Sequence, residues 1–201
     1  VMDDHTKAIM LASVQEINGY RADVKAITEL CHKRGIYVAI DGVQEVGALK
    51  VDVRETDVDF FCAGGKKWIC NPFGMGFLYI RRELVKVLDP MYYGYFSMKF
   101  PEKFSDYVSY LEDPARNPFD DCGIINDATK FEIMGFSNYL GALGLREAIR
   151  VQMDEGLENI ENKIKSLNKH LVEGLKKLNI RPCSPEDEEH MSGVASFNFG
   201  F

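Results

Sequence analysis

The chain has 201 residues, of which 46% are hydrophobic and 27% are charged, a composition typical of globular proteins and unlike disordered or fibrous ones. Its 24 Lys and Arg residues are outnumbered by 31 Asp and Glu residues, and the net charge of −7 argues against nucleic acid and anionic membranes as partners. The apolar runs are too short to span a bilayer, and the five cysteines are odd in number and widely spaced. We therefore expect a cytoplasmic protein with reduced thiols, no metal site and a small-molecule ligand.

The first half of the chain predicts a mainly parallel α/β sheet. Apolar runs at residues 8–14 and 36–40 have the length of strands, and the helical spacing of apolar residues between them ends at Gly35. A strand, a helix and a second strand in this order form a βαβ unit with a right-handed crossover. Two more strands are expected at residues 58–63 and 76–80, and a loop rich in Gly, Lys and Pro joins them.

The second half of the chain predicts long helices. Residues 84–127 are rich in Pro and aromatic residues, and we assign no regular element to them. A helix is expected at 139–149, and apolar residues over 153–178 recur at spacings of three and four, as along the buried face of one long helix. An alternating stretch at 196–201 predicts the beginning of a strand, and because the chain opens on Val1 we expect a piece of a longer protein.

Three short segments at the expected carboxyl edge of the sheet could carry chemistry. Asp41 ends a buried strand, Lys66 and Lys67 lie in the glycine-flanked loop after another strand, and Pro-Phe-Gly-Met-Gly at 72–76 leads into the next. Ligands of open α/β sheets bind at this edge. A lysine there can form an imine with an aldehyde cofactor, and a carboxylate can keep a pyridine nitrogen protonated, which is the chemistry of pyridoxal 5'-phosphate (PLP). Taken singly, a strand-end aspartate is more often a turn residue, and paired lysines are usually solvated.

Taken in order, these segments resemble the class V aminotransferase family of fold-type-I PLP enzymes, which includes cysteine desulfurases, isopenicillin-N epimerase-like proteins and kynureninase. The segments that carry the resemblance are Ala12-Ser-Val-Gln-Glu-Ile-Asn-Gly19, Asp41-Gly-Val-Gln44, Lys67-Trp-Ile-Cys-Asn-Pro72, Phe131-Glu132 and Ser192-Gly-Val-Ala-Ser-Phe197. The resemblance implies part of the large PLP-binding α/β domain over 1–90, a connecting region and returning helix over 91–150, and a long helix with the start of a small α+β C-terminal domain over 151–201.

The resemblance also implies roles for single residues. Lys67 is then the Schiff-base lysine, which holds the cofactor and moves protons at the substrate. Asp41 pairs with the pyridine nitrogen, Gln44 donates a hydrogen bond to the phenolic oxygen of the ring, and Val43 packs on a ring face.

The phosphate site departs from the family pattern. The family's Ser-x-His-Lys reads Gly64-Gly-Lys-Lys here, so Lys66 is expected to supply a charge in place of a hydroxyl and an imidazole. A Thr that reaches the phosphate of the neighbouring subunit is replaced by Phe136, and Ser137 is the candidate to act one residue later. At Glu16 many relatives have an Asn near the cofactor ring.

From this resemblance we expect a PLP-dependent aminotransferase that acts on an amino acid or amine and forms a homodimer. A cysteine desulfurase or a related PLP lyase or epimerase is an alternative, and a non-catalytic homologue or fragment kept for dimerisation is an alternative of another class. A generic nucleotide-binding module is disfavoured, because no Gly-rich strand-to-helix turn is present. We expect the 201-residue piece alone to be inactive, because the resemblance places one ring contact and most of the phosphate site before residue 1.

Overall fold

The computed structural model describes residues 2–94, 97–99, 112–113, 115, 123–132 and 138–200. The chain divides into two compact units. The first comprises residues 1–79 and 138–201, and the second comprises residues 80–137.

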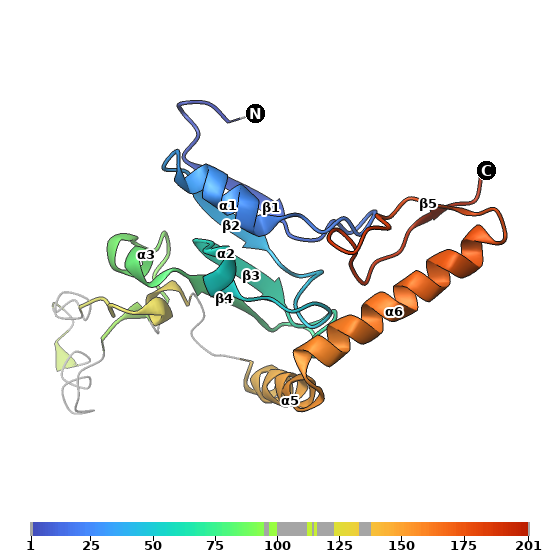
Figure 1. Ribbon diagram of the computed structural model, residues 1–201. Coiled ribbons are helices and arrows are strands. Elements are labelled where there is room, and N and C mark those ends of the chain that lie inside the picture. The colour runs from blue at the N-terminus through green and yellow to red at the C-terminus, as the bar shows by residue number, and fades with distance from the viewer. Residues whose placement is uncertain are drawn as a thin grey trace. The chain divides into compact units, whose positions relative to one another are not determined.

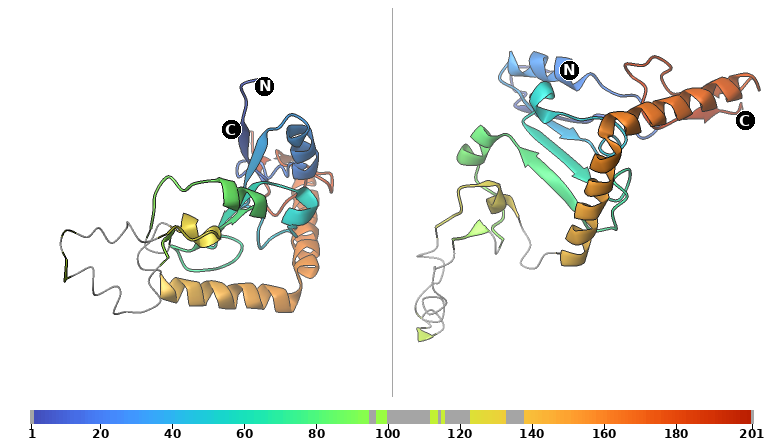
Figure 2. Two further views of the ribbon diagram at one scale, coloured as in Figure 1. Left: turned by 90° about the vertical axis from the view of Figure 1, so that its left-hand side faces the viewer. Right: turned by 60° about the horizontal axis from the view of Figure 1, so that its bottom comes forward.

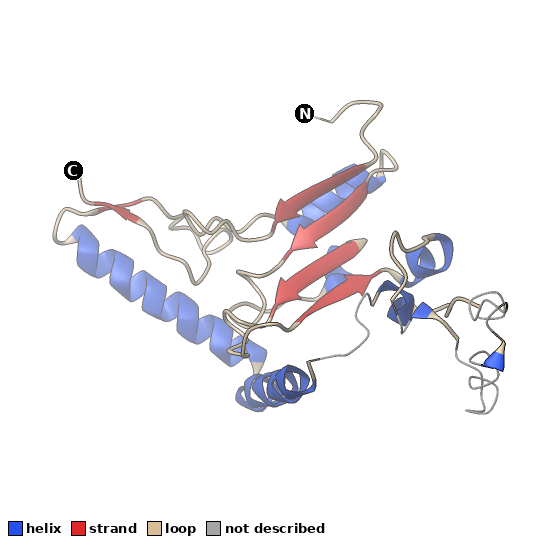
Figure 3. Cartoon of the chain, turned by 180° about the vertical axis from the view of Figure 1, so that it is seen from behind, coloured by secondary structure: helices blue, strands red, loops and turns tan. Residues whose placement is uncertain are grey.

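The first unit is built on a four-stranded sheet in the order β1-β2-β3-β4 (Figure 1). The strands are β1 (Ala8–Ala12), β2 (Tyr37–Asp41), β3 (Phe60–Gly64) and β4 (Gly76–Ile80). The first three are parallel, whereas the arrow of β4 points the other way (Figure 3). The chain reverses between β3 and β4, where the Gly65 N–H donates a hydrogen bond to the Met75 carbonyl at 2.9 Å. The expected mainly parallel α/β sheet is confirmed.

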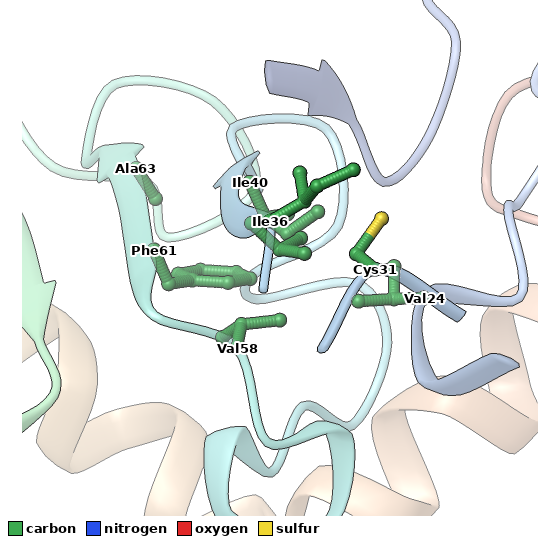
Figure 4. Packing of buried hydrophobic residues seen from close by; sticks show 8 residues of the cluster. Val24, Cys31, Ile36, Ile40, Val58, Phe61 and Ala63 are labelled. Carbon is green, nitrogen blue, oxygen red and sulfur yellow. The ribbon is translucent and has the colours of Figure 1, made fainter. Parts of the chain in front are cut away.

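One face of this sheet packs against helix α1 (Val24–His32), which connects β1 to β2. The Asp23 carboxylate begins the helix by accepting a hydrogen bond from the Ala26 N–H at 2.9 Å, and Gly35 (φ 67°) lets the chain reverse after it. The core side chains come from α1, from alternate positions on β2 and β3, and from one residue shortly before each of these strands (Figure 4). They are Val24, Cys31, Ile36, Val38, Ile40, Val58, Phe61 and Ala63. The short helix α2 (Val53–Thr56) contacts α1.

The other face of the sheet is open within the described chain. Because strand residues alternate, the neighbours of the core residues point to this face. Met10 is 83% exposed, and Tyr37 and Leu78 are also exposed. Asp41 and Cys62, which pair in register, lie on the same face.

The helical region does not form one long helix. Helix α5 (Tyr139–Glu155) ends at Gly156, and α6 (Leu157–Lys176) begins directly after it, so the two helices meet at an angle (Figure 2). Gly156 has φ 84°, a conformation that glycine adopts at little cost and that no helix contains. The prediction of a continuous helix over 153–178 is therefore wrong at Gly156.

The C-terminal residues return to the loop that follows β1. Strands β5 (Arg181–Pro182) and β6 (Phe197–Asn198) form a small antiparallel sheet, so the strand expected at 196–201 is present but short. The buried Ser192 hydroxyl donates a hydrogen bond to the Gly19 carbonyl at 2.7 Å. A Cβ at Gly19 would lie 2.3 Å from the Val194 carbonyl oxygen, so this approach requires glycine. The two regions are therefore packed backbone to backbone.

The second unit contains helix α3 (Arg82–Val87) and the 3₁₀ helix η2 (Ala128–Phe131). We assigned no regular element to 84–127, and this is wrong at α3, where Leu84 and Val85 are buried. Because the residues that follow are rich in proline, the sequence pattern did not predict this short helix. The buried Ser97 hydroxyl donates a hydrogen bond to the Lys130 carbonyl at 2.8 Å, which joins residue 97 to η2.

Candidate active site

The end of β2 places Asp41 at the carboxyl edge of the sheet. The Val43 N–H donates a hydrogen bond to Asp41 Oδ1 at 2.9 Å, which orients the carboxylate within its own turn. The Asp41 carbonyl accepts a hydrogen bond from the Ser13 N–H at 3.0 Å, so the ends of β1 and β2 are joined. The carboxylate is exposed and is free to meet a ligand from the open face.

Lys67 lies in the loop between β3 and β4, which its own hydrogen bonds hold in shape. The Asn71 N–H donates to the Gly65 carbonyl at 2.9 Å, and the Cys70 N–H donates to the Lys67 carbonyl at 2.9 Å. Lys67 Nζ is 3.9 Å from Glu16 Oε2, in the loop after β1. The three loops after β1, β2 and β3 thus bring Glu16, Asp41 and Lys67 to one edge, as the strand order predicts.

The two adjacent lysines have different partners. Lys67 faces the Glu16 carboxylate, whereas Lys66 Nζ is 5.4 Å from the centre of the Phe73 ring, at cation–π distance. Lys66 is exposed and Lys67 is half-buried, with 30% of its side chain accessible. The two amines therefore differ in their neighbours and in their exposure to solvent.

Val43 and Gln44 are half-buried in the turn after Asp41. A Cβ at Gly64 would lie 3.7 Å from a Val43 methyl group, so this turn reaches the end of β3. Ser137 falls outside the described residues, and its predicted role at the phosphate stays a prediction.

Cys62 is a neighbour of the site that the motifs did not indicate. It pairs in register with Asp41, and burial together with the Asp41 charge raises the pKa of its thiol. The sequence signal for Cys62 is strand alternation: because Phe61 and Ala63 face the core, Cys62 must point to the opposite face of the sheet.

The residues at this edge fit the ring and the aldehyde of PLP. They supply a primary amine, a carboxylate and an aliphatic side chain that lies near a glycine. For a phosphate group, this loop offers the Lys66 cation.

Across the described ranges, no three His, Cys, Asp or Glu side chains gather as metal ligands. The helices in these ranges include none that is long and apolar enough to cross a membrane.

The family model for class-V aminotransferases matches residues 1–200. The chain belongs to this family. It is 29% identical over 195 residues to a probable cysteine desulfurase of Pyrococcus abyssi, covering 96% of this chain and 44% of that protein. It is 31% identical over 201 residues to a cysteine desulfurase of Serratia proteamaculans, covering 100% of this chain and 45% of the relative. The chain thus spans less than half the length of these relatives.

Solved structures agree with this assignment. The apo cysteine desulfurase of Thermococcus onnurineus NA1 superposes with a TM-score of 0.81 at 26% identity, covering 96% of this chain and 44% of that one. C-DES, solved with glycine covalently linked to its PLP cofactor, shares the fold with a TM-score of 0.81 at 22% identity, covering 98% of this chain and 48% of that one. The fold-type-I architecture implied by the resemblance is confirmed, and membership of the class-V family supports PLP as the cofactor.

Proposed function

We propose that the complete protein is a PLP-dependent enzyme that acts on an amino acid or amine and is held to its cofactor through Lys67. The observation that supports this best is that Asp41 ends β2 and Lys67 lies in the loop after the neighbouring strand β3, at the carboxyl edge of the sheet. When bound, PLP supplies an electron-accepting ring joined to the substrate nitrogen.

Each residue then has a distinct task. The Lys67 amine would hold the cofactor and would move a proton at the substrate α-carbon. The Asp41 carboxylate stabilises positive charge at the ring nitrogen, and Val43 packs on one face of the ring. Gln44 donates a hydrogen bond to the ring oxygen, and Lys66 with Ser137 supplies charge and a hydroxyl to the phosphate.

For the reaction we propose amino-group transfer, with cysteine desulfurisation as the second candidate. The second is favoured by the names of several relatives. The first is favoured by the uncharacterized aminotransferase YcbU of Bacillus subtilis (strain 168), which is 35% identical over 89 residues, covering 44% of this chain and 24% of that protein. The products separate the two: transfer needs a 2-oxo acid and gives a new amino acid, whereas desulfurisation gives alanine and leaves sulfur on a thiol.

Borohydride reduction of the full-length protein with PLP, followed by peptide mapping, tests the proposal. We expect a phosphopyridoxyl group on Lys67. A group on Lys66 with Lys67 unmodified would overturn the assignment. The non-catalytic alternative predicts no covalent label at either lysine.

The predicted assembly and location also stay proposals. We propose a homodimer in the cytoplasm. In this dimer the segment 130–138, of which 133–137 lie outside the described residues, would approach the partner's cofactor. The domain boundaries near residues 90 and 150 are proposed in the same way. Light scattering of the full-length protein at micromolar concentration tests the dimer, and a monomer would contradict it.

A further inference from the structure

Trp68, the residue after Lys67, is enclosed on several sides by parts of the chain distant in sequence. A Cβ at Gly193 would lie 2.8 Å from two atoms of its indole ring, and Ile164 of α6 packs in the same cluster. A Cβ at Gly47 would lie 2.7 Å from the Trp68 carbonyl carbon. Both positions therefore require glycine, and the ring and the backbone of Trp68 are closely surrounded.

The carbonyl of Trp68 is held by a side chain from α5. Gln152 Nε2 donates a hydrogen bond to this oxygen at 2.7 Å, across 84 residues of sequence, and the contact is partly buried. The same oxygen is 3.5 Å from Cys70 Sγ, a weak donor within the loop itself. The Gln152 bond is the shorter of the two and the one from outside the loop, so turning this peptide would lose the stronger partner of the carbonyl. The orientation of the loop is thus set from α5.

The loop needs such support because of its own composition. Cys70 has φ 62°, an unfavourable conformation for a residue with a side chain, and it closes the turn that begins at Lys67. Two glycines precede the adjacent lysines. A change in this backbone would redirect both amines, and misplacement of a reacting group by 1 Å is costly.

We propose that Gln152 is a positioning residue that makes Lys67, and not Lys66, the amine presented to the cofactor. Gln152 acts through the Trp68 carbonyl and does not touch the reacting atoms. The proposal rests on the proposed function of Lys67 and adds the means by which one of two neighbouring lysines is selected.

The test uses the full-length protein with PLP, and compares wild type, Gln152→Met and Arg150→Met. Gln152→Met keeps the length of the side chain and removes the donor. Arg150 lies on the same helix with 62% of its side chain exposed, and its ion pairs are with Glu147 and Asp154, so it is the matched control. The readouts are the share of borohydride-trapped label on each lysine and the PLP dissociation constant from absorbance.

In wild type and Arg150→Met we expect label on Lys67 alone. In Gln152→Met we expect roughly a tenth or more of the label on Lys66 and PLP binding about tenfold weaker, because one hydrogen bond that fixes the loop is lost. A general loss of stability would weaken binding without moving label between the lysines. Gln152→Glu, which keeps the shape and replaces the donor with an acceptor, should redistribute the label in the same way.

One outcome overturns the inference alone, and a different one overturns the proposed function as well. Label on Lys67 alone in both Gln152 variants, with PLP binding within twofold of wild type, overturns the inference only. Absence of label on Lys67 in wild type overturns the proposed function and the inference with it. If these two Gln152 variants do not fold by circular dichroism, Gln152→Asn, which keeps an amide but draws the donor back by one methylene, decides by the same readout.

Discussion

The two edges of the central sheet use their aspartates differently. At the amino edge, Asp59 is 3% exposed, accepts a hydrogen bond from the Val38 N–H at 2.8 Å and contacts His32 Nε2 at 2.9 Å. At the carboxyl edge, Asp41 is exposed and is oriented by a hydrogen bond within its own turn. A carboxylate whose oxygens accept hydrogen bonds from within the protein stabilises the fold. A carboxylate that is oriented by one such bond and remains exposed can bind a ligand.

The largest effect is expected from Lys67→Ala at the open edge. Activity of the full-length enzyme should fall by about 10³-fold or more, because both the cofactor anchor and the proton carrier are lost. Steady-state turnover and cofactor absorbance measure this. Lys66→Ala is the control, and an equal loss in both variants would remove the distinction between the two lysines.

Asp41→Asn tests the charge at the same edge with the shape preserved. We expect turnover to fall roughly 10²-fold, because charge at the ring nitrogen is no longer stabilised, while the thermal midpoint changes little. Turnover equal to wild type would mean that Asp41 is only a turn residue.

Asp59→Ala should show the opposite behaviour. It leaves the Val38 N–H without its acceptor in a buried position, so we expect a loss of roughly 1–3 kcal/mol in unfolding free energy. Urea denaturation measures this. Turnover per folded molecule should match wild type, and a selective loss of turnover would contradict the structural role of this edge.

Glu161 on α6 is a second carboxylate whose acceptors are used by the fold. Burial by itself would raise its pKa, but the hydrogen bonds from Lys165 and the Lys50 N–H, with the charge of Arg21, hold the pKa below its usual value. A lowered pKa adds stability above about 4.5, and this is lost as the pH falls through the folded value. The stability difference between wild type and Glu161→Gln should therefore shrink from pH 6 toward pH 3.5 in urea denaturation.

The smallest effect is expected from Glu16→Gln. The Glu16 carboxylate is 72% exposed and 3.9 Å from Lys67 Nζ, and exposed ion pairs of this kind contribute little. We expect PLP affinity to change less than about threefold. A titration of the full-length protein with PLP measures it, and a tenfold change would show that Glu16 belongs to the site.

Local patterns predicted the sheet and the first helix, because apolar runs bounded by turn residues specify β1 to β4 and α1 directly. Asp41 and Lys67 could be found because both follow strands that end at the same edge. The break at Gly156 was missed because the apolar stripe continues across it. Gln152 could not be predicted, because its contact with Trp68 joins residues 84 apart and such a contact produces no repeating pattern in the sequence.

The bond between Ser192 and Gly19 has a consequence for the order of folding. Neighbouring strands in the sheet are consecutive in sequence, so the sheet closes only short and moderate loops. The Ser192 contact spans 173 residues, and contacts of long sequence separation form slowly. Gly193 lies next to it and packs on Trp68. We therefore expect the Lys67 loop to reach its final shape late in folding, after the sheet itself is complete.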